Sequence, residues 1–585
     1  MKHLRPHHLS RSLSLALVVL LVGISASVRT TAAENKTPST PMRIYVAKRI
    51  ITMDASQPFA TAVAVADGRI VAVGDLASMR GWMEARPYEI DRGFAEKILV
   101  PGLIDNHVHP LLAAMLLNTY WISPHVWEGA GLDVPATRGR EAYLTRLREA
   151  LARESVPREA PFITWGYFEA WHGVIRRAEL DRLSPRRPLI LWQRSFHEIV
   201  ANTAALRWLG VDPDSKVSPP DSDIARGVFS ERGLLTVLKP LSAWLLSPEH
   251  LAKGIARYES IVRQGGVTTI ADMGVGGYFG LHEDAAVLRK AFDRPEAPFR
   301  VVLVPAPLSI LASRGVPAAV EEVERFVATD YGRLRAARHV KLLADGAFFA
   351  QYMMMRPPGY TDGHQGKWLM PPEQLEAAAQ DFWQRGFQIH VHVNGDAGVA
   401  ATLDILERLQ NQKPRADHRF TLHHVGFATN DQLRRASRQG VVISAQPYYL
   451  WALADIYALR GLGGDRAAEM ARIGAMIRNG IPTSLHSDFT MAPEAPLVLA
   501  WVAVNRVTSE GTLMAPEERI SVTDALRAIT IDAAFALRME DEIGSIVAGK
   551  SADFTVLEQD PYEVAPMNLK DIPIWGTVYQ GRVMD

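Results

Sequence analysis

The feature that most limits what this chain can fold into is the spacing of three polar residues, each at the end of a short apolar run. His424 lies 32 residues after His392, and Asp488 lies 64 residues after His424. A (β/α)₈ barrel of about 250 residues has eight units of roughly 31 residues each. The three residues therefore fit the carboxyl ends of strands 5, 6 and 8 of one barrel, where catalytic side chains of this fold lie.

Further apolar runs fill the other strand positions. They are residues 267–272, 300–304, 339–343 and 441–446, which we assign to strands 2, 3, 4 and 7. The chain has 585 residues, of which 48% are hydrophobic, enough for a large core and for more than one domain. The sequence thus predicts an α/β protein with a (β/α)₈ TIM barrel over residues 99–539.

A His-Val-His step follows the apolar run Lys97–Val100. Residues two apart in a strand point to the same face, so His107 and His109 are placed to present both imidazoles to one metal ion. An isolated pair of this kind more often has no ligand role and is simply buried in the core or exposed on the surface. Its place after a strand-like run favours a ligand role. The chain has no cysteine, which excludes disulfides and thiolate ligands and leaves histidine, carboxylate or a modified lysine to bind metal.

Strand patterns recur at both ends of the chain. Asp67-Gly68 between two alternating runs is a hairpin signal, and similar runs return at residues 552–557 and 577–583. We expect residues 42–98 and 540–585 to form one small β-sandwich domain with a structural role.

The stretch between strands 1 and 2 is far too long for one βα unit. From His109 to Asp272 is 163 residues, so a subdomain of about 130 residues is inserted, at about 120–247. It is rich in tryptophan, tyrosine and phenylalanine. Such residues usually form a local core, but an insertion after strand 1 begins on the catalytic rim and is also placed to cap the site.

The first 33 residues have the layout of a secretory signal. Lys2, Arg5 and Arg11 precede an apolar stretch at 13–24, and Thr31-Ala32-Ala33 offers small residues for cleavage. We expect an exported, periplasmic or secreted protein with no stable membrane span after cleavage; an uncleaved anchor is the alternative. The formal net charge of zero argues against a nucleic-acid partner. The expected partner is a small-molecule substrate, and a homodimer is left open.

Several longer motifs occur in a fixed order. They are Val100-Pro101-Gly102-Leu103-Ile104-Asp105-Asn106-His107-Val108-His109, residues 340–346, residues 390–396, Ser487-Asp488, and residues 543–553. In this combination the chain resembles the amidohydrolase superfamily, in the branch of YtcJ-like metal-dependent hydrolases that includes N-substituted formamide deformylases. The resemblance covers nearly all of residues 42–585.

The resemblance implies a metal centre with one or two divalent ions, zinc being the expected metal. His107 and His109 would bind one ion, His392 and His424 a second, and Lys341, as a carbamate, would bridge them. An ammonium buried without a partner is costly, which favours this role for Lys341; the alternative is a lysine that reaches solvent from the rim.

The chain departs from the family pattern at two places. His423 stands where relatives commonly carry Glu, and Val393-Asn394 replaces the usual Ala-Ile. Neither change removes a ligand, but either alters the groups that orient one. We interpret His390 and His486 as orienting or packing residues rather than ligands.

Asp488 is predicted both as a metal ligand and as the catalytic group that takes a proton from water and passes it to the leaving amine. The predicted activity is metal-dependent hydrolysis of an amide or related C–N bond, with esters also open. Weaker candidates for substrate binding are His197, Tyr352, Tyr448 and Trp451. Apolar rim loops favour a hydrophobic or aromatic substrate, unless these rings pack under the insertion. The alternatives are a deaminase or isomerase on the same scaffold, or a non-catalytic secreted binding protein.

Overall fold

The computed structural model of the chain describes residues 41–584, apart from 130–131 and 154–159. The expected signal segment, residues 1–33, lies outside the described residues. None of the helices within the described part is both long and apolar enough to cross a membrane.

Parallel strands from the middle of the chain form two sheets, with the orders β16-β15-β14-β5 and β17-β18-β19-β20-β21. The strands are β5 (Leu103–Val108), β14 (Val267–Val275), β15 (Arg300–Pro305), β16 (Arg335–Ala336), β17 (His339–Leu343), β18 (Gln388–Val393), β19 (Thr421–His424), β20 (Val442–Ala445) and β21 (Thr483–Leu485). Strands 2 to 8 lie where the apolar runs predict them. This agreement has a simple reason, since a strand buried on both faces is rich in apolar residues.

The two parallel sheets meet at both edges. β15 contacts β17 at one edge, and β5 contacts β21 at the other. At the second edge the side-chain amide of Asn106 donates to Ser484 Oγ at 2.8 Å, and the backbone N–H of Asp488 donates to the carbonyl of His107 at 3.0 Å. The fold is α/β and TIM-barrel-like, so the residues that follow the strands gather at one end.

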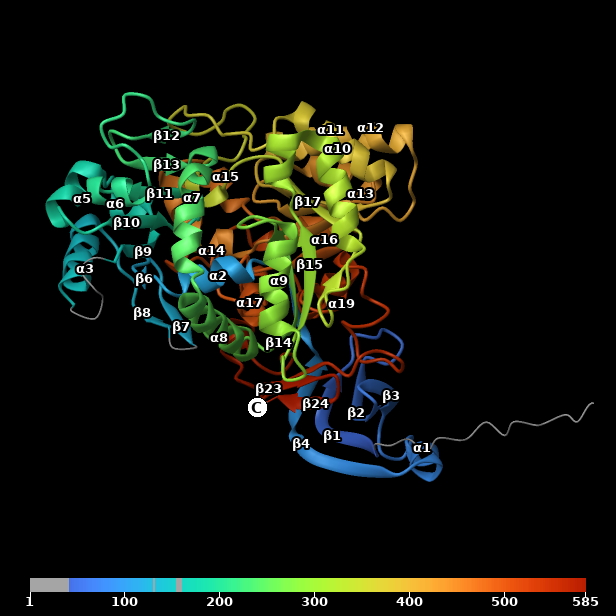
Figure 1. The fold of residues 1–585 in the computed structure, drawn as a ribbon. Coiled ribbons are helices and arrows are strands. Elements are labelled where there is room, and N and C mark those ends of the chain that lie inside the picture. Colours follow the sequence, from blue (N-terminus) through green and yellow to red (C-terminus); the bar gives the residue numbers. More distant parts are fainter. Residues whose placement is uncertain (1–40, 130–131, 154–159, 585) are drawn as a thin grey trace, which may run out of the picture. The chain divides into compact units, whose positions relative to one another are not determined.

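Helices connect successive strands. They include α8 (Pro248–Gln264), α9 (Leu281–Phe292), α10 (Leu308–Val327), α11 (Pro372–Gln384), α12 (Asp396–Gln412), α13 (Asn430–Arg438), α14 (Tyr448–Leu459), α16 (Ile473–Arg478), α17 (Pro496–Asn505), α18 (Val522–Ala528) and α19 (Ile531–Ala536). α9 lies beside β14 and β15 (Figure 1). Its buried apolar residues recur every three or four positions, as in a helix with one apolar face: Leu281, Ala285, Leu288 and Phe292. α13 begins with a reciprocal cap between Thr429 and Gln432.

The apolar run Lys97–Val100, which precedes the His-Val-His step, is not the strand that carries His107. That run belongs to β4 (Tyr88–Pro101), which pairs with β1 (Met42–Ile51) and β22 (Phe554–Leu557) in the terminal sheet. The first strand of the parallel sheets is β5, which starts after Gly102. A Cβ at Gly102 would lie 2.0 Å from Thr268 Oγ1, so the close approach to β14 requires glycine. Lys97–Val100 is the more apolar of the two segments, since β5 carries Asp105, Asn106 and His107, and the apolar pattern does not tell which sheet each joins.

Strands from both ends of the chain join in one seven-stranded sheet, ordered β24-β23-β22-β4-β1-β2-β3. The strands not yet bounded are β2 (Phe59–Ala66), β3 (Arg69–Gly74), β23 (Ile574–Tyr579) and β24 (Arg582–Met584). The predicted hairpin at Asp67-Gly68 is confirmed: β2 and β3 are antiparallel, and both turn residues have positive φ, 52° and 75°. The seven strands form one hydrogen-bonded sheet, and the division into the two layers of a β-sandwich stays a prediction.

The segment inserted after β5 carries a mixed sheet of its own, ordered β12-β13-β11-β10-β9-β6. Its strands are β6 (Tyr120–Trp121), β9 (Phe162–Tyr167), β10 (Leu189–Gln193), β11 (Glu198–Ala201), β12 (Ser222–Asp223) and β13 (Val228–Ser230), and its longer helices are α3 (Arg140–Ala152) and α7 (Arg232–Leu245). Its aromatic residues serve two cores. Tyr143 and Tyr167 belong to a local cluster, whereas Trp121, Trp127 and Trp165 belong to the large central core.

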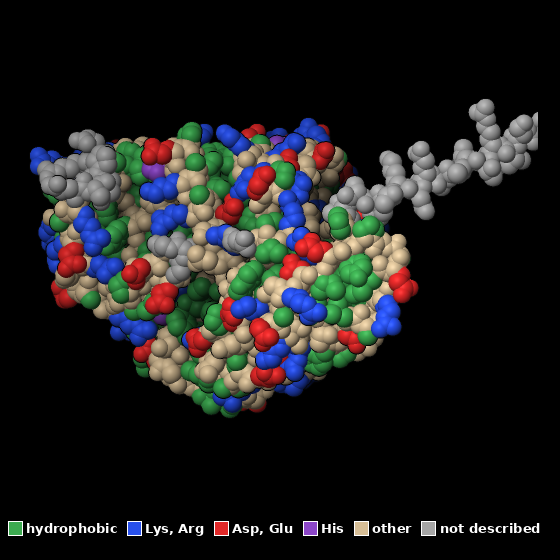
Figure 2. Space-filling view, turned by 90° about the horizontal axis from the view of Figure 1, so that it is seen from below, with side chains coloured by type: hydrophobic (Ala, Val, Ile, Leu, Met, Phe, Trp, Pro, Cys, Tyr) green, Lys and Arg blue, Asp and Glu red, His purple; other side chains and the backbone are tan. Residues whose placement is uncertain are grey.

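Charged side chains are interspersed by sign on the face shown in Figure 2. Many of the described ones form ion pairs, such as Arg408 with Glu376 and Arg419 with Glu540. An exposed pair such as Arg408 with Glu376 contributes little to stability by itself, whereas Arg419 with Glu540 is largely shielded from solvent.

Candidate metal centre

His107, His109 and Asp488 converge on one point at the carboxyl ends of β5 and β21. His107 lies in β5, and His109 follows the strand directly before α2 (Pro110–Leu116). Their Nε2 atoms lie 3.9 Å and 3.3 Å from Asp488 Oδ1. One ligand atom from each of the three residues lies within 4.8 Å of the other two, a spacing that suits a metal ion. The structure therefore brings together three of the predicted ligands.

His392 and His424 line the other side of Asp488. The two imidazole centroids are 4.5 Å apart, and His424 Nδ1 lies 3.9 Å from Asp488 Oδ2. Neither histidine belongs to a described group whose ligand atoms all lie within 4.8 Å of one another. The carboxylate of Asp488 thus has one oxygen toward His107 and His109 and the other toward His424.

Lys341 lies inside β17 and is 2% exposed. Its Nζ has no hydrogen-bond partner among the described residues. Burial lowers the pKa of this amine to about 7, against an opposing effect of the Asp488 charge. An orphaned buried amine that is partly neutral near pH 7 fits a lysine that is to be converted into an anionic carbamate ligand.

Burial also keeps most of the site histidines neutral, with an electron pair available on each ring. It lowers the pKa of His107, His392 and His424 well below the ordinary value, and the charge of Lys341 adds to this effect. His109 differs. Burial lowers its pKa, but the carboxylates of Asp272 and Asp488 outweigh burial and raise it to about 9. An ion bound by His109 must therefore displace a proton.

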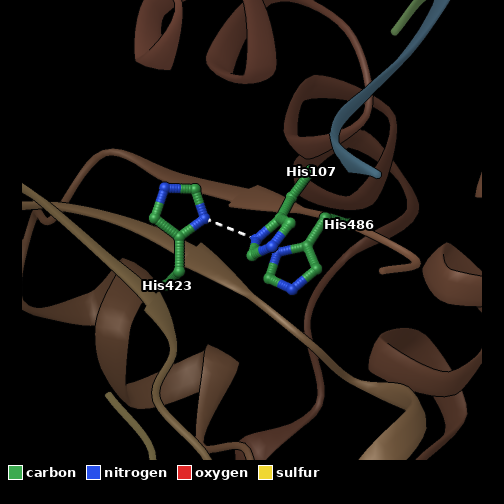
Figure 3. Close-up of side chains that lie close together, drawn as sticks. All are labelled: His107, His423 and His486. Atoms are coloured by element: carbon green, nitrogen blue, oxygen red, sulfur yellow. Dashed lines mark hydrogen bonds between the residues drawn. The ribbon is translucent and has the colours of Figure 1, made fainter. Parts of the chain in front are cut away.

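Two further histidines, His423 and His486, lie beside His107 (Figure 3). Their nitrogens also fall within 4.8 Å of one another and of His107. However, His107 Nδ1 and His423 Nδ1 are 2.8 Å apart, a hydrogen-bond distance. Two nitrogens on a tetrahedral zinc ion would lie about 3.3 Å apart. We interpret this group as hydrogen-bonded imidazoles that orient a ligand, which is the role predicted for His486.

A second hydrogen-bonded line orients His424. The Ser444 hydroxyl donates to Asn106 Oδ1 at 2.9 Å, so its oxygen accepts from His486 Nδ1 at 2.8 Å. His486 Nε2 then accepts from His424 Nδ1 at 3.1 Å. This order leaves His424 Nε2 with a free electron pair, as a ligand nitrogen needs.

Backbone strain accompanies the site. Asp488 and His424 both have left-handed backbones, with φ of 52° and 74°. Such conformations cost free energy outside glycine and cluster at functional sites. The neighbouring Ser487 is held by its backbone N–H, which donates to both carboxylate oxygens of Asp105 at 3.2 Å.

Asp272 is a site residue that the sequence analysis does not single out. It lies in β14, and its Oδ1 is 3.7 Å from His109 Nδ1. A carboxylate on the far nitrogen of a ligand histidine fixes the orientation of the ring. Its position at the end of the predicted second strand is the sequence signal that could have identified it as a site residue.

The weaker substrate-binding candidates lie in two places. His197 comes from the insertion, its ring is 6.2 Å from that of His392, and its Nδ1 donates to Glu231 at 2.8 Å. Tyr352 instead donates its hydroxyl to Glu198 at 3.3 Å. Tyr448 and Trp451 pack on each other with ring centroids 4.7 Å apart.

The aromatic cluster around Tyr448 and Trp451 includes residues of the insertion. The guanidinium of Arg194 lies over the Tyr448 ring, and the ring of His125 lies 5.0 Å from that of Trp451. The neighbouring Tyr449 lies close to a predicted metal ligand: its ring centroid is 6.3 Å from that of His424. The insertion therefore contributes to the rim as well as holding its own core.

The chain is similar in sequence and in structure to several known proteins. The model of a family described as the amidohydrolase family matches residues 95–585. The chain is 27% identical over 545 residues to the protein LONG AFTER FAR-RED 3 of Arabidopsis thaliana, covering 88% of this chain and 86% of that one. It is 25% identical over 544 residues to the N-substituted formamide deformylase of Arthrobacter pascens, covering 91% and 96%. The crystal structure of an uncharacterized metal-dependent hydrolase from Pyrococcus horikoshii has the same fold, with a TM-score of 0.67, 20% identity, and coverage of 90% and 99%.

Proposed function

The chain belongs to the amidohydrolase family, in its YtcJ-like branch, and we propose that it is a metal-dependent hydrolase that cleaves an amide or related C–N bond of a small hydrophobic or aromatic molecule. The observation that carries the proposal is the convergence of His107, His109 and Asp488. We place this chemistry at the carboxyl end of a closed eight-stranded barrel, which the contacts of β15 with β17 and of β21 with β5 support.

In this proposal His107 and His109 hold one ion, His392 and His424 hold a second, and Lys341, as a carbamate, lies between them, with Asp488 as a further ligand. The four imidazoles, three of which burial keeps neutral, together with one carboxylate and one orphaned amine, fit a divalent ion with nitrogen and oxygen ligands, zinc being the expected one. A bound ion of this kind supplies Lewis acidity, which activates water and polarises a carbonyl group.

The chain's own part in the reaction is proton transfer and orientation. Asp488 is 14% exposed in its side chain and has no cationic lysine or arginine paired with it among the described residues. Its carboxylate is therefore available to take a proton from water and to deliver it to the leaving nitrogen. His197 donates from Nδ1 to Glu231, which fixes its ring and directs the other nitrogen to bind substrate.

Deamination or isomerisation on the same scaffold is the alternative reaction, because a fold does not fix the chemistry. Release of ammonia from a heterocycle would identify a deaminase, whereas the proposed activity releases an acid and an amine. A secreted binding protein without activity is the remaining alternative, and a lack of any turnover by metal-loaded protein would support it.

Replacement of Lys341 by alanine is expected to lower metal content and turnover together. In the native chain the neutral amine adds to carbon dioxide and releases one proton to form the carbamate, and alanine offers no such group. Acetate or propionate is expected to restore part of the activity by occupying the vacated position. Metal analysis, turnover with and without carboxylate, and carbon-13 spectra after labelling with bicarbonate measure these effects.

The control for that variant is Lys367→Ala, because Lys367 lies over the Tyr352 ring and its Nζ already has a partner, donating to Ser230 at 3.2 Å. We expect Lys367→Ala to keep its metal. Full metal content and activity in Lys341→Ala would show that the lysine is not a ligand.

The proposed substrate class is tested by comparing two compounds. An aromatic N-acyl or N-formyl amine is expected to give a higher kcat/KM than a short charged N-acyl amino acid, because the rim residues Tyr448, Tyr449 and Trp451 are aromatic. Trp451→Ala should lower kcat/KM for the aromatic compound more than for the short one. A preference for the charged compound would contradict the proposed class.

A further inference from the structure

Arg194 is a buried arginine without an acidic partner. It follows β10 in the inserted segment and is 0% exposed. It forms no ion pair with any carboxylate in the described part of the chain. Burial lowers the pKa of its guanidinium, and the group that opposes this effect is the Tyr448 phenol, which stays neutral near pH 7 because burial raises its own pKa. A buried charge without a counter-charge is costly, so this arginine needs an explanation.

Two other buried arginines of the chain are compensated. Arg300, which is 5% exposed, donates from Nη1 to a carboxylate at 2.8 Å. Arg506, which is 1% exposed, donates to four backbone carbonyl oxygens at 2.8 to 3.0 Å. Arg194 instead donates to the carbonyl of Met491 at 3.1 Å and to His125 Nδ1, and its Nε has no partner among the described residues. It therefore keeps both an unbalanced charge and an unused N–H donor.

Aromatic rings surround the guanidinium of Arg194. Its carbon lies 4.9 Å from the centroid of Phe349, 5.5 Å from that of Trp127 and 5.6 Å from that of Tyr448. Phe349 follows β17, and Tyr448 begins α14 after β20, so the charge lies among the rim loops of the candidate site. Apolar rings keep water away, and an ionic hydrogen bond is stronger where water is excluded.

The ring of His125 lies between Arg194 and the outer part of the rim. Its centroid is 5.0 Å from that of Trp451 and 6.3 Å from that of Trp171. Both tryptophans are partly exposed. Nε1 of Trp171 is a second buried donor that has no partner in the part of the chain that the structure describes. Unused donors thus lie on both sides of His125, and an anionic acceptor would satisfy them.

Two aromatic rings separate Arg194 from the metal centre. The guanidinium lies over Phe349, the ring of Phe349 is 5.6 Å from that of Tyr449, and the ring of Tyr449 is 6.3 Å from that of His424. A molecule that reaches both ends needs an apolar part about as long as these two side chains. A short charged compound cannot span them.

We propose that Arg194 is a specificity residue that binds a carboxylate at the end of the substrate far from the scissile bond. The inference rests on the proposed function and narrows its substrate class to elongated aromatic amides with a terminal carboxylate. This group supplies the counter-charge that the free protein lacks, and a guanidinium matches the two oxygens of a carboxylate in geometry.

The test measures binding without turnover. The probes are 4-methylbenzoate and 4-methylbenzamide, which share one ring and differ in charge. Calorimetric titration of the zinc-loaded native protein is expected to show that 4-methylbenzoate binds about 10- to 100-fold more tightly, the contribution of a hydrogen bond to a charged group. Arg194→Met keeps an apolar side chain of similar length and removes the charge. It should bind the two compounds equally.

The matched control is Arg138→Met. Arg138 lies 4.5 Å from the Trp171 ring in the same part of the rim, but it pairs with Glu510 and donates to the Pro124 carbonyl at 3.0 Å. We expect this variant to retain the preference for 4-methylbenzoate. Arg194→Lys keeps the charge without the planar fork, so it should show a weaker preference. It takes the place of Arg194→Met if that variant does not fold.

Equal affinity of the native protein for the two compounds would overturn the inference. A preference for 4-methylbenzoate that survives in Arg194→Met would also overturn it, because the carboxylate would then bind elsewhere, such as at the metal. Equal loss in Arg194→Met and Arg138→Met would show a general effect of positive charge and would count against it too. If N-acyl amines are not hydrolysed but the preference for 4-methylbenzoate depends on Arg194, the proposed function fails and the carboxylate site stands.

Discussion

The His107→Ala variant is expected to lose both its metal and its turnover while remaining folded. His107 faces Asp488 with one nitrogen and His423 with the other, so both ring nitrogens make polar contacts at the centre and the ring contributes little to apolar packing. Loss of a group that only orients a ligand costs about 10- to 100-fold in affinity or activity, and loss of the ligand itself should cost more. His392→Ala should behave in the same way.

Elemental analysis of purified protein, turnover and thermal unfolding measure the three parts of this expectation. His418→Ala is the matched control, because His418 is equally buried and hydrogen-bonded but lies outside the centre. We expect this control to keep native metal content. Normal metal in both His107→Ala and His392→Ala would show that these histidines are not ligands.

Asp488→Asn is expected to reduce kcat by about 10²- to 10⁴-fold, the usual contribution of a positioned proton-transfer group. Asparagine is the informative substitution because the backbone of Asp488 is left-handed, with φ of 52°, and asparagine tolerates that conformation better than most residues. The amide also keeps an oxygen that can contact an ion, but it cannot take a proton near neutral pH. Turnover should therefore fall further than metal content.

The comparison that isolates proton transfer uses Asp272→Asn. Asp272 faces His109 Nδ1 at 3.7 Å and orients a ligand, so Asp272→Asn should lower metal affinity or activity by about 10- to 100-fold. Turnover of both variants is measured at saturating zinc, which removes differences in affinity. Native kcat in Asp488→Asn under these conditions would rule out a proton-transfer role for that residue.

The sequence predicts those parts of the site that depend on local features, namely apolar runs and the spacing between residues. Strands 2 to 8 lie at the predicted runs, because strands buried on both faces are rich in apolar residues whichever strand they pair with. The positions of His392, His424 and Asp488 follow from the length of a βα unit. His107 and His109 are two residues apart, in or next to one strand, and this spacing is enough to point both imidazoles at the same carboxylate.

Other parts were decided only by tertiary structure. Lys97–Val100 and Leu103–Val108 are separated by only two residues, yet they join different sheets, because the pairing partners of each strand decide the sheet. The bond between His107 and His423 joins residues 316 positions apart. Composition and periodicity record whether a residue is buried, but not which distant residue it meets. The hydrogen-bonded line of His107, His423, His390 and His339 therefore forms only once the strands lie side by side, where buried rings must bond to one another.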